Sequence, residues 1–258
     1  MCFPRLFVST EGTRKIMNSP LTDVVIRGSG SDGNSQLIGG HLVVDVGLPW
    51  AVIGDDVMHA RIILISHEHG DHMRIPVLRS LVKYRPMVVT KGVYLNRSCF
   101  RQLQRNAPEV ARLIPPEHVI KAGDTFDYTY QGREYSVEVF ELSHDVENCG
   151  FVITDRESGH RLIHATDTMT MKWAPAGRFD TLLVEGNYDP ELTVRDIASG
   201  DVAVMNRAAR NYRHLSVNAF EQFVLSRSSE VGRRHVAQLH VSFDYGRVSS
   251  LNTYPWAG

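Results

Sequence analysis

Short apolar runs rich in Val, Ile and Leu recur along the chain between turn residues, and one stretch, "YSVEVFELSH", alternates between apolar and polar positions. Continuous apolar runs are typical of strands buried on both faces, and alternation is typical of strands with one exposed face. The glycine pair at 39–40 interrupts one run and predicts a tight hairpin turn. We therefore predict strands at residues 22–28, 35–47 (two strands around the glycine pair), 60–66, 86–90, 135–144, 149–154, 160–167, 180–187 and 235–242.

Three stretches instead repeat their apolar residues with the period of a helix, which predicts helices at 73–84, 94–113 and 216–227. Pro76 falls in the first turn of the first of these, where proline is tolerated. The strands form two groups, each followed by helices, and no repeat or linker separates them. We predict an N-terminal extension over 1–20 and one α/β (α+β) domain over 21–258, with two mixed sheets inside and helices outside.

Composition narrows the classes of function that the chain can have. With 258 residues, of which 43% are hydrophobic, it can bury a full core, and its formal net charge of −1 argues against a protein that coats nucleic acid or lies on membranes. Local basic patches remain compatible with that total. Three separated cysteines favour a reducing compartment. We found neither an apolar signal segment nor a run of about 20 apolar residues, so we expect a cytoplasmic protein without membrane contact.

Residues 66–72 read "SHEHGDH", directly after a predicted buried strand. Alternation along an extended segment points His67 and His69 to the same side, and a turn at the next glycine brings Asp71 and His72 toward a neighbouring position. Imidazole nitrogen and carboxylate oxygen are ligands of zinc and similar metals. A solvated polar loop would explain one or two histidines, but the pattern H-x-H-x-D-H at the end of a strand favours a metal site.

Further candidate ligands stand at the ends of other predicted strands. His144 ends "VFELSH", Asp167 ends "RLIHATD" and His240 lies in "AQLHVS". Each alone is more typical of a structural residue, but together they complete a set for two metal ions. The predicted set places His67, His69 and His144 on one ion, Asp71, His72 and His240 on the other, and Asp167 between them.

The motif H-x-H-x-D-H, "DVG" at 45–47 and "ATDT" at 165–168 resemble the metallo-β-lactamase superfamily over nearly the whole chain from about residue 22. The resemblance implies an αββα sandwich with two divalent metal ions at the edge between its sheets. It also implies that Asp45 orients a ligand histidine. The ligand types favour zinc, and manganese is also compatible.

Three further stretches resemble a branch of that superfamily that cuts phosphodiesters. "GSGSDGNSQLI" (28–38), "VEGNYD" (184–189) and "RHLSVN" (213–218) are similar to stretches of the WalJ-type 5′ exonucleases, although Tyr188 stands where those enzymes have histidine. The phage anti-Pycsar phosphodiesterases, which cleave cyclic nucleotides, have a similar pattern. The resemblance therefore implies a metal-dependent phosphodiesterase.

The same resemblance implies roles for individual residues. Asp71 would act both as a ligand and as a proton acceptor, and His214 would contact a phosphate oxygen or protonate the leaving oxygen. Asn187 would support the ligands or bind substrate. Arg213 belongs to the run "RNYRHLS" (210–216), which is either a solvated face or a substrate-facing loop in which Arg213 binds phosphate. The remaining histidines are predicted to be packing or surface residues: His41, His59, His118, His160, His164 and His235.

Three functions remain open from the sequence. A small cyclic nucleotide is slightly favoured as substrate. A protein that binds a long nucleic-acid strand is expected to have a basic groove, and the net charge does not indicate one. The alternatives are a 5′ exonuclease on DNA or RNA and a non-catalytic, metal-stabilised binding protein. Residues 92–113 or the N-terminal arm are expected to cover the site, and related compact phosphodiesterases are often dimers, so a homodimer is predicted.

Overall fold

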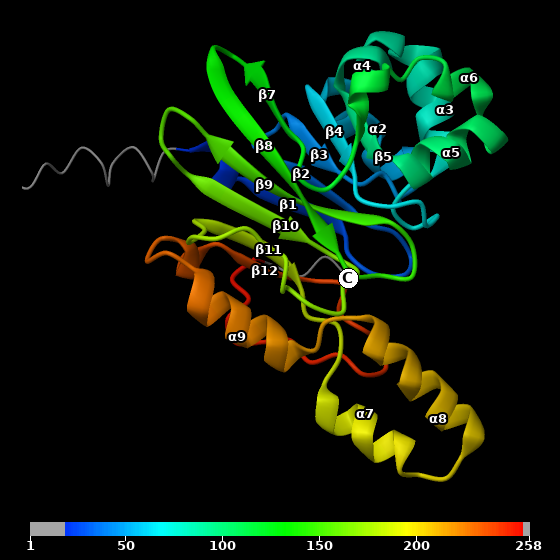
Figure 1. Cartoon of the computed structure of the whole chain (residues 1–258), viewed down its shortest axis with the longest axis vertical. Coiled ribbons are helices and arrows are strands. Elements are labelled where there is room, and N and C mark those ends of the chain that lie inside the picture. Colours follow the sequence, from blue (N-terminus) through cyan, green and yellow to red (C-terminus); the bar gives the residue numbers. More distant parts are fainter. Residues whose placement is uncertain (1–18, 255–258) are drawn as a thin grey trace, which may run out of the picture.

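The computed structural model describes residues 19–254, in which two six-stranded mixed sheets pack against each other (Figure 1). In spatial order the first sheet contains β1 (Val24–Gly28), β2 (Ser35–Ile38), β3 (Leu42–Val44), β4 (Ile62–Ile65), β5 (Val93–Asn96) and β6 (Val119–Ile120). The second contains β12 (Val236–Leu239), β11 (Thr181–Glu185), β10 (Arg161–Ala165), β9 (Asn148–Asp155), β8 (Arg133–Leu142) and β7 (Thr125–Tyr130). The strands β3 to β6 run parallel, as do β10 to β12, and the other pairs are antiparallel.

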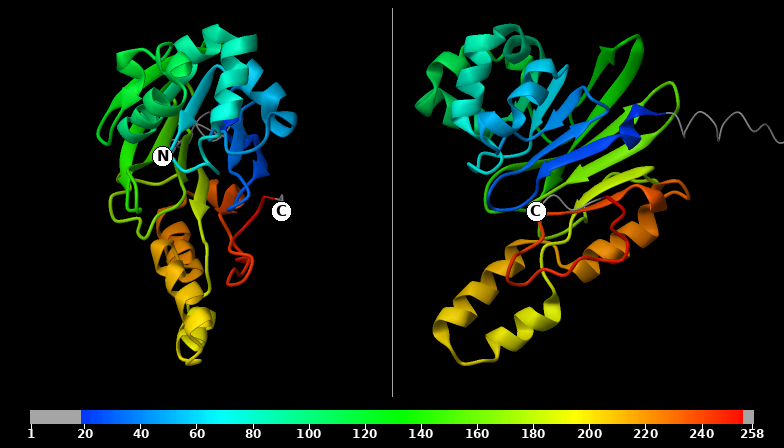
Figure 2. Two further views of the ribbon diagram at one scale, coloured as in Figure 1. Left: turned by 90° about the vertical axis from the view of Figure 1, so that its right-hand side faces the viewer. Right: turned by 180° about the vertical axis from the view of Figure 1, so that it is seen from behind.

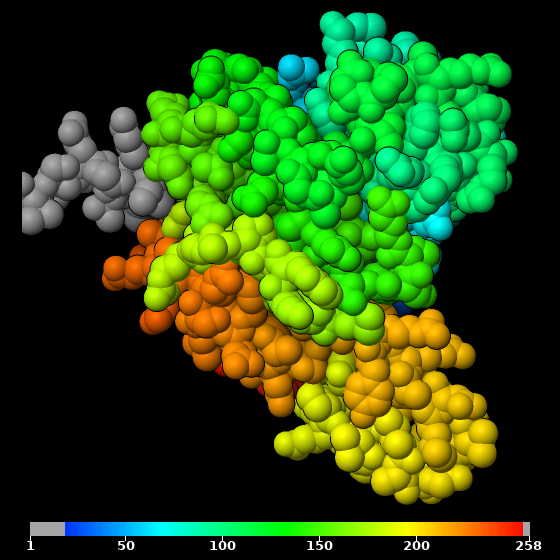
Figure 3. Space-filling model, viewed as in Figure 1, coloured from blue at the N-terminus to red at the C-terminus, as the bar shows by residue number. Residues whose placement is uncertain are grey.

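Helices lie on both outer faces of the sandwich (Figure 2). The first sheet is covered by α2 (Trp50–His59), α3 (Ile75–Tyr84), α4 (Pro86–Gly92), α5 (Arg97–Asn106) and α6 (Pro108–Ala111). The second is covered by α9 (Val217–Arg227), whereas α7 (Pro190–Ile197) and α8 (Val202–Ala209) form a hairpin that projects from the body as a separate lobe (Figure 3). Short 3-10 turns complete the order: η1 (Pro20–Thr22), η2 (Pro116–His118), η3 (Arg210–Arg213) and η4 (Gly232–Arg234). No helix within residues 19–254 is long and apolar enough to cross a membrane.

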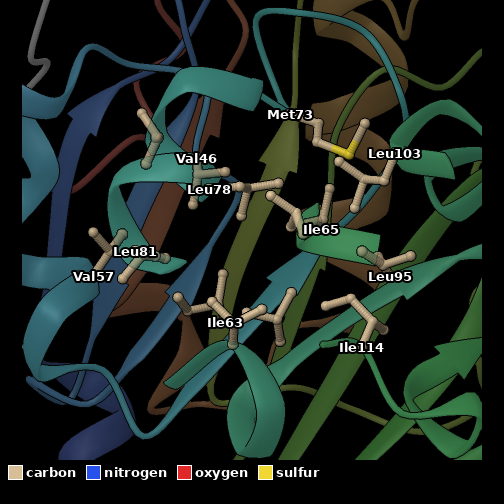
Figure 4. Close-up of a cluster of buried hydrophobic side chains, with 14 of the residues drawn as sticks. Val46, Val57, Ile63, Ile65, Met73, Leu78, Leu81, Leu95, Leu103 and Ile114 are labelled. Atoms are coloured by element: carbon tan, nitrogen blue, oxygen red, sulfur yellow. The ribbon is translucent and has the colours of Figure 1, made fainter. Parts of the chain in front are cut away.

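Three apolar layers hold this arrangement together. Side chains of both sheets meet in the centre, where Leu64 and Phe151 are fully buried. A second layer lies between the first sheet and its helices, with Ile63 and Leu81 among its members (Figure 4). A third lies under α9. Strands with apolar residues on both faces, such as β4, are therefore buried on both sides, as their continuous apolar sequence predicts.

The predicted αββα sandwich is confirmed, and most of the predicted elements are present with boundaries within a few residues. Gly39 and Gly40 adopt φ angles of 58° and 66° between β2 and β3, which is the left-handed conformation that a tight hairpin turn needs. Ser216 caps α9 by accepting a hydrogen bond from the backbone of Ala219 at 3.2 Å. Residues 1–18, which contain most of the predicted N-terminal extension, lie outside the described residues.

The predicted strand at 86–90 is wrong, because these residues begin helix α4. Pro86 stands in its first turn, where its fixed φ suits a helix, and Val89 packs into the layer beneath the helices. The helix ends at Gly92, where a β-carbon would approach the carbonyl oxygen of Arg61 to 2.5 Å. The strand of this region is β5, which follows directly.

The predicted single helix at 94–113 is also wrong in part. Its first residues belong to β5, and the rest is divided between α5 and α6. The side chain of Asn96 starts α5 by accepting a hydrogen bond from Cys99 N at 2.9 Å. The break before α6 falls at Pro108, which lacks the backbone donor that a continuous helix would use. The sequence patterns also missed α2, α7, α8, β6 and β7.

Candidate metal centre

The polar strand ends predicted from the sequence meet at one edge of the sandwich. The loop of residues 66–72 follows β4, Asp167 follows β10, His240 follows β12, and His144 follows β8. Because β3 and β4 run parallel, and so do β10 to β12, the carboxyl ends of the strands in each group lie at the same end of their sheet. The topology therefore gathers residues from both sheets into one site.

The first group of donors, called the three-histidine group below, contains His67, His69 and His144. One donor atom of each lies within 4.8 Å of the others. His67 Nε2 and His69 Nδ1 are 3.2 Å apart, and the His144 ring stands edge-on to both at 5.2 Å between ring centres. His67 is fully buried, whereas the side chain of His69 is 38% exposed. This group thus opens to solvent on one side.

The second group, called the carboxylate-held group below, contains Asp167, Glu185, His214 and His240, whose donor atoms also lie within 4.8 Å of one another. Asp167 Oδ1 is 3.4 Å from Nε2 of His240 and 3.4 Å from Nδ1 of His214. All four residues are at least four-fifths buried. Asp167 therefore reaches both imidazoles of this group.

His72 and Asp71 join the two groups. His72 Nε2 lies 2.7 Å from Asp167 Oδ2, and a donor atom of His72 also clusters with Asp71 and His240. Asp167 in turn clusters with His67 and His72. The structure therefore brings all seven predicted ligands into one continuous set, with Asp167 in contact with both ends of it.

Three residues of the site adopt left-handed backbone conformations that non-glycine residues rarely use. The φ angles are 62° for Asp45, 54° for Asp167 and 51° for His240, and each residue follows a strand by one or two positions. Such a conformation costs about 1–3 kcal/mol and persists only where its surroundings enforce it. At each of the three positions it turns the chain sharply at the strand end, where the side chain enters the site.

Asp45 lies behind His72 and holds it. Its Oδ2 is 2.7 Å from His72 Nδ1, and its two oxygens accept hydrogen bonds from the backbone and hydroxyl of Ser66 at 2.8 and 2.9 Å. Gly47 makes this packing possible, because a β-carbon there would lie 1.6 Å from the carbonyl oxygen of Asp71. The "DVG" stretch thus combines an acid that orients a histidine with a glycine that admits the donor loop.

Glu185 is the buried residue that the sequence patterns missed. Its Oε1 lies 2.7 Å from His214 Nδ1 and 3.4 Å from His240 Nδ1, and its Oε2 accepts a hydrogen bond from Thr168 N at 2.7 Å. A signal did exist, since a glutamate that ends the apolar strand "TLLVE" must find partners when it is buried. Asn187 supports the same group, with its Nδ2 2.9 Å from His240 Nδ1.

Arg213 lies at the rim rather than among the donors. Its Nη1 is 3.6 Å from Asp145 Oδ2, and Asp145 Oδ1 lies 3.5 Å from His69 and 3.2 Å from His144. Both Arg213 and Asp145 are exposed enough to exchange partners. Asp145 was not predicted from the sequence, because an acid beside a histidine in a loop is unremarkable until the fold is known.

The two groups differ in electrostatics. Burial lowers the pKa values of His67 and His144, with further lowering by neighbouring histidines. Burial also acts against charge at His72, but Asp167 and Asp45 outweigh it and raise the His72 pKa well above the ordinary value. In the same way Asp167 and Glu185 overcome burial at His240 and raise its pKa to about 9. A carboxylate neighbour therefore decides whether a buried imidazole is neutral or charged.

The donor set fits divalent metal ions. Among the described residues, the buried Nδ1 of His144 has no hydrogen-bond partner, and His67 and His69 direct ring nitrogens toward each other at 3.2 Å. A shared cation satisfies such an arrangement better than protons do, because imidazole nitrogens are good ligands of Zn²⁺ and similar ions. The predicted packing histidines stay out of the set: buried His164, for example, bonds to Gln36 between the sheets.

Comparisons with known proteins agree with this fold. The family model described as "Beta-lactamase superfamily domain" matches residues 44–221. The short form of human tRNase Z (ELAC1) shares 14% identity with a TM-score of 0.57, over 86% of this chain and 93% of that one. The metallo-β-lactamase fold protein YhfI from Bacillus subtilis shares 16% identity with a TM-score of 0.51, over 85% and 86%. Curated protein sequences give no match. The chain therefore belongs to the β-lactamase superfamily, with the metal-binding, metallo-β-lactamase form of its fold.

Proposed function

We propose that the protein is a binuclear metal-dependent phosphodiesterase that hydrolyses a nucleotide phosphodiester. The observation that carries the proposal is the continuous set of seven donors in which Asp167 contacts both ends. His67, His69 and His144 would hold one ion and Asp71, His72 and His240 the other, with Asp167 between them. The donors are mostly imidazoles, which favours zinc, while the two carboxylates also suit manganese.

Two bound divalent ions supply Lewis acidity toward phosphoryl oxygens and lower the pKa of a water toward about 7. The protein residues then have to move protons and position the substrate. Asp71 is partly exposed and lies 3.6 Å from His72 Nε2, so its carboxylate is available to accept a proton. Its backbone carbonyl is held by Asn34 N at 2.7 Å, which keeps the acid in place.

His214 is suited to contact the phosphate or protonate the leaving oxygen. Its Nδ1 faces Glu185, while within residues 19–254 its Nε2 has no hydrogen-bond partner. The side chain is 20% exposed and lines a cavity of about 740 Å³ together with His240. Glu185 therefore holds one ring nitrogen, and the other is left to reach a substrate oxygen.

The cavity also bears on the substrate. Its volume falls within the range of about 300–1,000 Å³ typical of small-molecule sites, which supports a single nucleotide as the bound unit. A 3′,5′-cyclic nucleotide is therefore the first candidate substrate. A nucleic-acid end is the second, and it is favoured by Arg210 on the cavity wall, which has no ion-pair partner among the described residues.

The decisive experiment incubates metal-loaded protein with 3′,5′-cyclic nucleotides and with 5′-phosphorylated single-stranded DNA, followed by chromatography of the products. We expect one of the two substrates to be consumed, and chelation of the metal to stop the reaction. If elemental analysis finds about two metal ions per chain and neither substrate reacts, a non-catalytic metal-stabilised binding protein becomes the better interpretation.

The predicted homodimer stays a prediction. Residues 92–113 were expected to cover the site, but they pack into the layer outside the first sheet, and none of them lines the cavity beside His214. Within one chain these residues therefore do not form its wall. Light scattering at micromolar concentration measures the assembly, and a fully active monomer would exclude a shared pocket.

A further inference from the structure

The cavity beside His214 has walls from three segments that are far apart in the sequence. They are the glycine-rich turn 28–33, the end of α8 with η3, and the loop 241–245. The turn is fastened to the donor site, because Ser29 Oγ accepts a hydrogen bond from His240 N at 2.7 Å. The walls are therefore positioned by the same residues that form the site, and a ligand held by the donors would extend into this space.

One positive charge on the wall is uncompensated. Arg27 pairs with Asp56 at 2.8 Å and Arg207 with Asp244 at 3.6 Å, so these two guanidinium groups already have acidic partners. Arg210 also lines the cavity, and its side chain has no hydrogen-bond or ion-pair partner within residues 19–254. It begins η3, the turn that leads directly to His214. Arg210 is thus a free cation beside the proposed phosphate-contacting histidine.

A free acid and a free aromatic ring also face this space. Asp32 lies on the glycine-rich turn without a partner among the described residues, and its negative charge offsets that of Arg210 in the total for the wall. An anion near His214 is therefore favoured by the position of Arg210 and not by a net positive charge of the wall. Phe243 lines the cavity from the loop 241–245, and the residue is 100% exposed. Single exposed apolar residues are common, but a phenyl ring at the rim of a polar cavity offers a face on which a base can stack.

We infer that this cavity binds the nucleoside of the substrate, with the ring of Phe243 stacked on the base and the guanidinium of Arg210 paired with a second phosphate. The inference rests on the proposed function, because the first phosphate is the one placed at the metal centre. It also narrows that function, since a substrate with two phosphates is an oligonucleotide end or a dinucleotide. The inference therefore favours the second candidate substrate, a nucleic-acid end, over the first, a 3′,5′-cyclic mononucleotide.

Equilibrium binding to the zinc-loaded protein tests this without any turnover. The three probes are adenosine 3′,5′-bisphosphate, adenosine 5′-monophosphate and inorganic phosphate, none of which is a phosphodiester. At low ionic strength we expect the bisphosphate to bind about 10-fold more tightly than the monophosphate, as for a charged hydrogen bond. The monophosphate should bind about 10-fold more tightly than phosphate through stacking.

Single variants assign each of the two differences in affinity to one residue. Arg210→Ala should remove the advantage of the bisphosphate over the monophosphate, and Phe243→Ala should remove the advantage of the monophosphate over phosphate. Arg105→Ala, an exposed arginine of α5 outside the cavity, is the matched control for charge. Leu225→Ala, an exposed apolar residue of α9, is the control for apolar area.

The results separate this inference from the proposed function. If the wild type binds all three probes equally, or the two variants keep both advantages, the inference is wrong even when the protein hydrolyses phosphodiesters. If only one of the two variants loses its expected advantage, the contact of the residue replaced in that variant is supported, and the contact of the other residue is rejected. If the protein binds the probes in the expected order but hydrolyses no phosphodiester, the binding site is supported and the proposed activity is rejected.

Discussion

The three-histidine group and the carboxylate-held group use the same side chain in opposite surroundings. In the first, His67, His69 and His144 contact mainly one another, and the nearest acid, Asp145, is 42% exposed. In the second, His214 and His240 lie against the buried carboxylates of Asp167 and Glu185. The first half of the site thus has a partly exposed acid as its ion-pair partner, whereas the second has two buried carboxylates.

This difference shows how a fold prepares a histidine for its task. An imidazole that only has to bind a metal needs a free nitrogen, which neighbouring imidazoles leave available. One that has to keep a fixed orientation next to a substrate needs a partner on its other nitrogen, and a carboxylate provides it. The following predictions test this contrast, beginning with the largest expected effect.

Asp167→Ala removes the residue that contacts both halves. Elemental analysis should find close to two metal ions per wild-type chain and clearly fewer in the variant, because the donors that Asp167 joins lose their shared acid. Phosphodiester turnover should fall with the metal content. Asp55→Ala, an exposed acid of α2 outside the site, is the control. Full metal retention in Asp167→Ala would rule out the bridging role.

His214→Ala should separate chemistry from metal binding. We expect the variant to keep its metal ions and to lose about 10²–10⁴-fold in turnover, the usual range for a general acid. The plot of turnover against pH should also lose one of its limbs, a change that a purely structural role would not cause. His59→Ala is the control, since His59 is exposed and distant in the fold. Turnover near the wild-type value would make His214 a structural residue.

Asp45→Asn tests the support of His72. An outer partner of a metal ligand typically changes metal affinity by about 10–100-fold, so we expect weaker binding of one ion and little change for the other. Competition with a chromogenic chelator measures both affinities. Asp56→Asn, a buried acid that pairs with Arg27 and belongs to none of the donor groups, controls for loss of a buried charge. Equal weakening of both ions would contradict the division into two groups.

His164 tests the same physics without any metal. It is fully buried, no acid within residues 19–254 is in contact with it, and burial lowers its pKa to about 4. Because the unfolded chain binds a proton below pH about 6.5 and the folded chain does not, the free energy of unfolding should fall as the pH decreases. Between pH 7 and 5.5 this histidine should account for about 1 kcal/mol.

Urea unfolding of wild type and His164→Gln at both pH values isolates that contribution. The variant should lose less stability than the wild type over this range, by the amount that His164 contributes. His59→Gln, an exposed histidine, should match the wild type. An unchanged pH dependence in His164→Gln would show that burial alone does not keep this imidazole neutral.

The sequence predicted the fold and the donors where local signals suffice. Seven donor residues could be named because they follow apolar runs directly, and strand ends meet when strands run parallel. Glu185 was missed, since only the pairing of β11 with β12 places it beside His240. The strand predicted at 86–90 failed because "MVV" has strand propensity, while packing under the first sheet's helices selected a helix.

The left-handed residues at Asp45, Asp167 and His240 set a limit on how this protein can be improved. Glycine adopts that backbone conformation freely, so replacing any of the three with glycine relieves local strain while deleting a side chain of the site. At Asp45 and Asp167, however, the same replacement takes an acid away from the buried His72, and breaking such a buried pair costs about 3–5 kcal/mol, more than the relief of strain. Replacement by glycine, a usual route to a more stable turn, is therefore closed at these positions, and the strained backbone stays because the buried imidazole needs its acids.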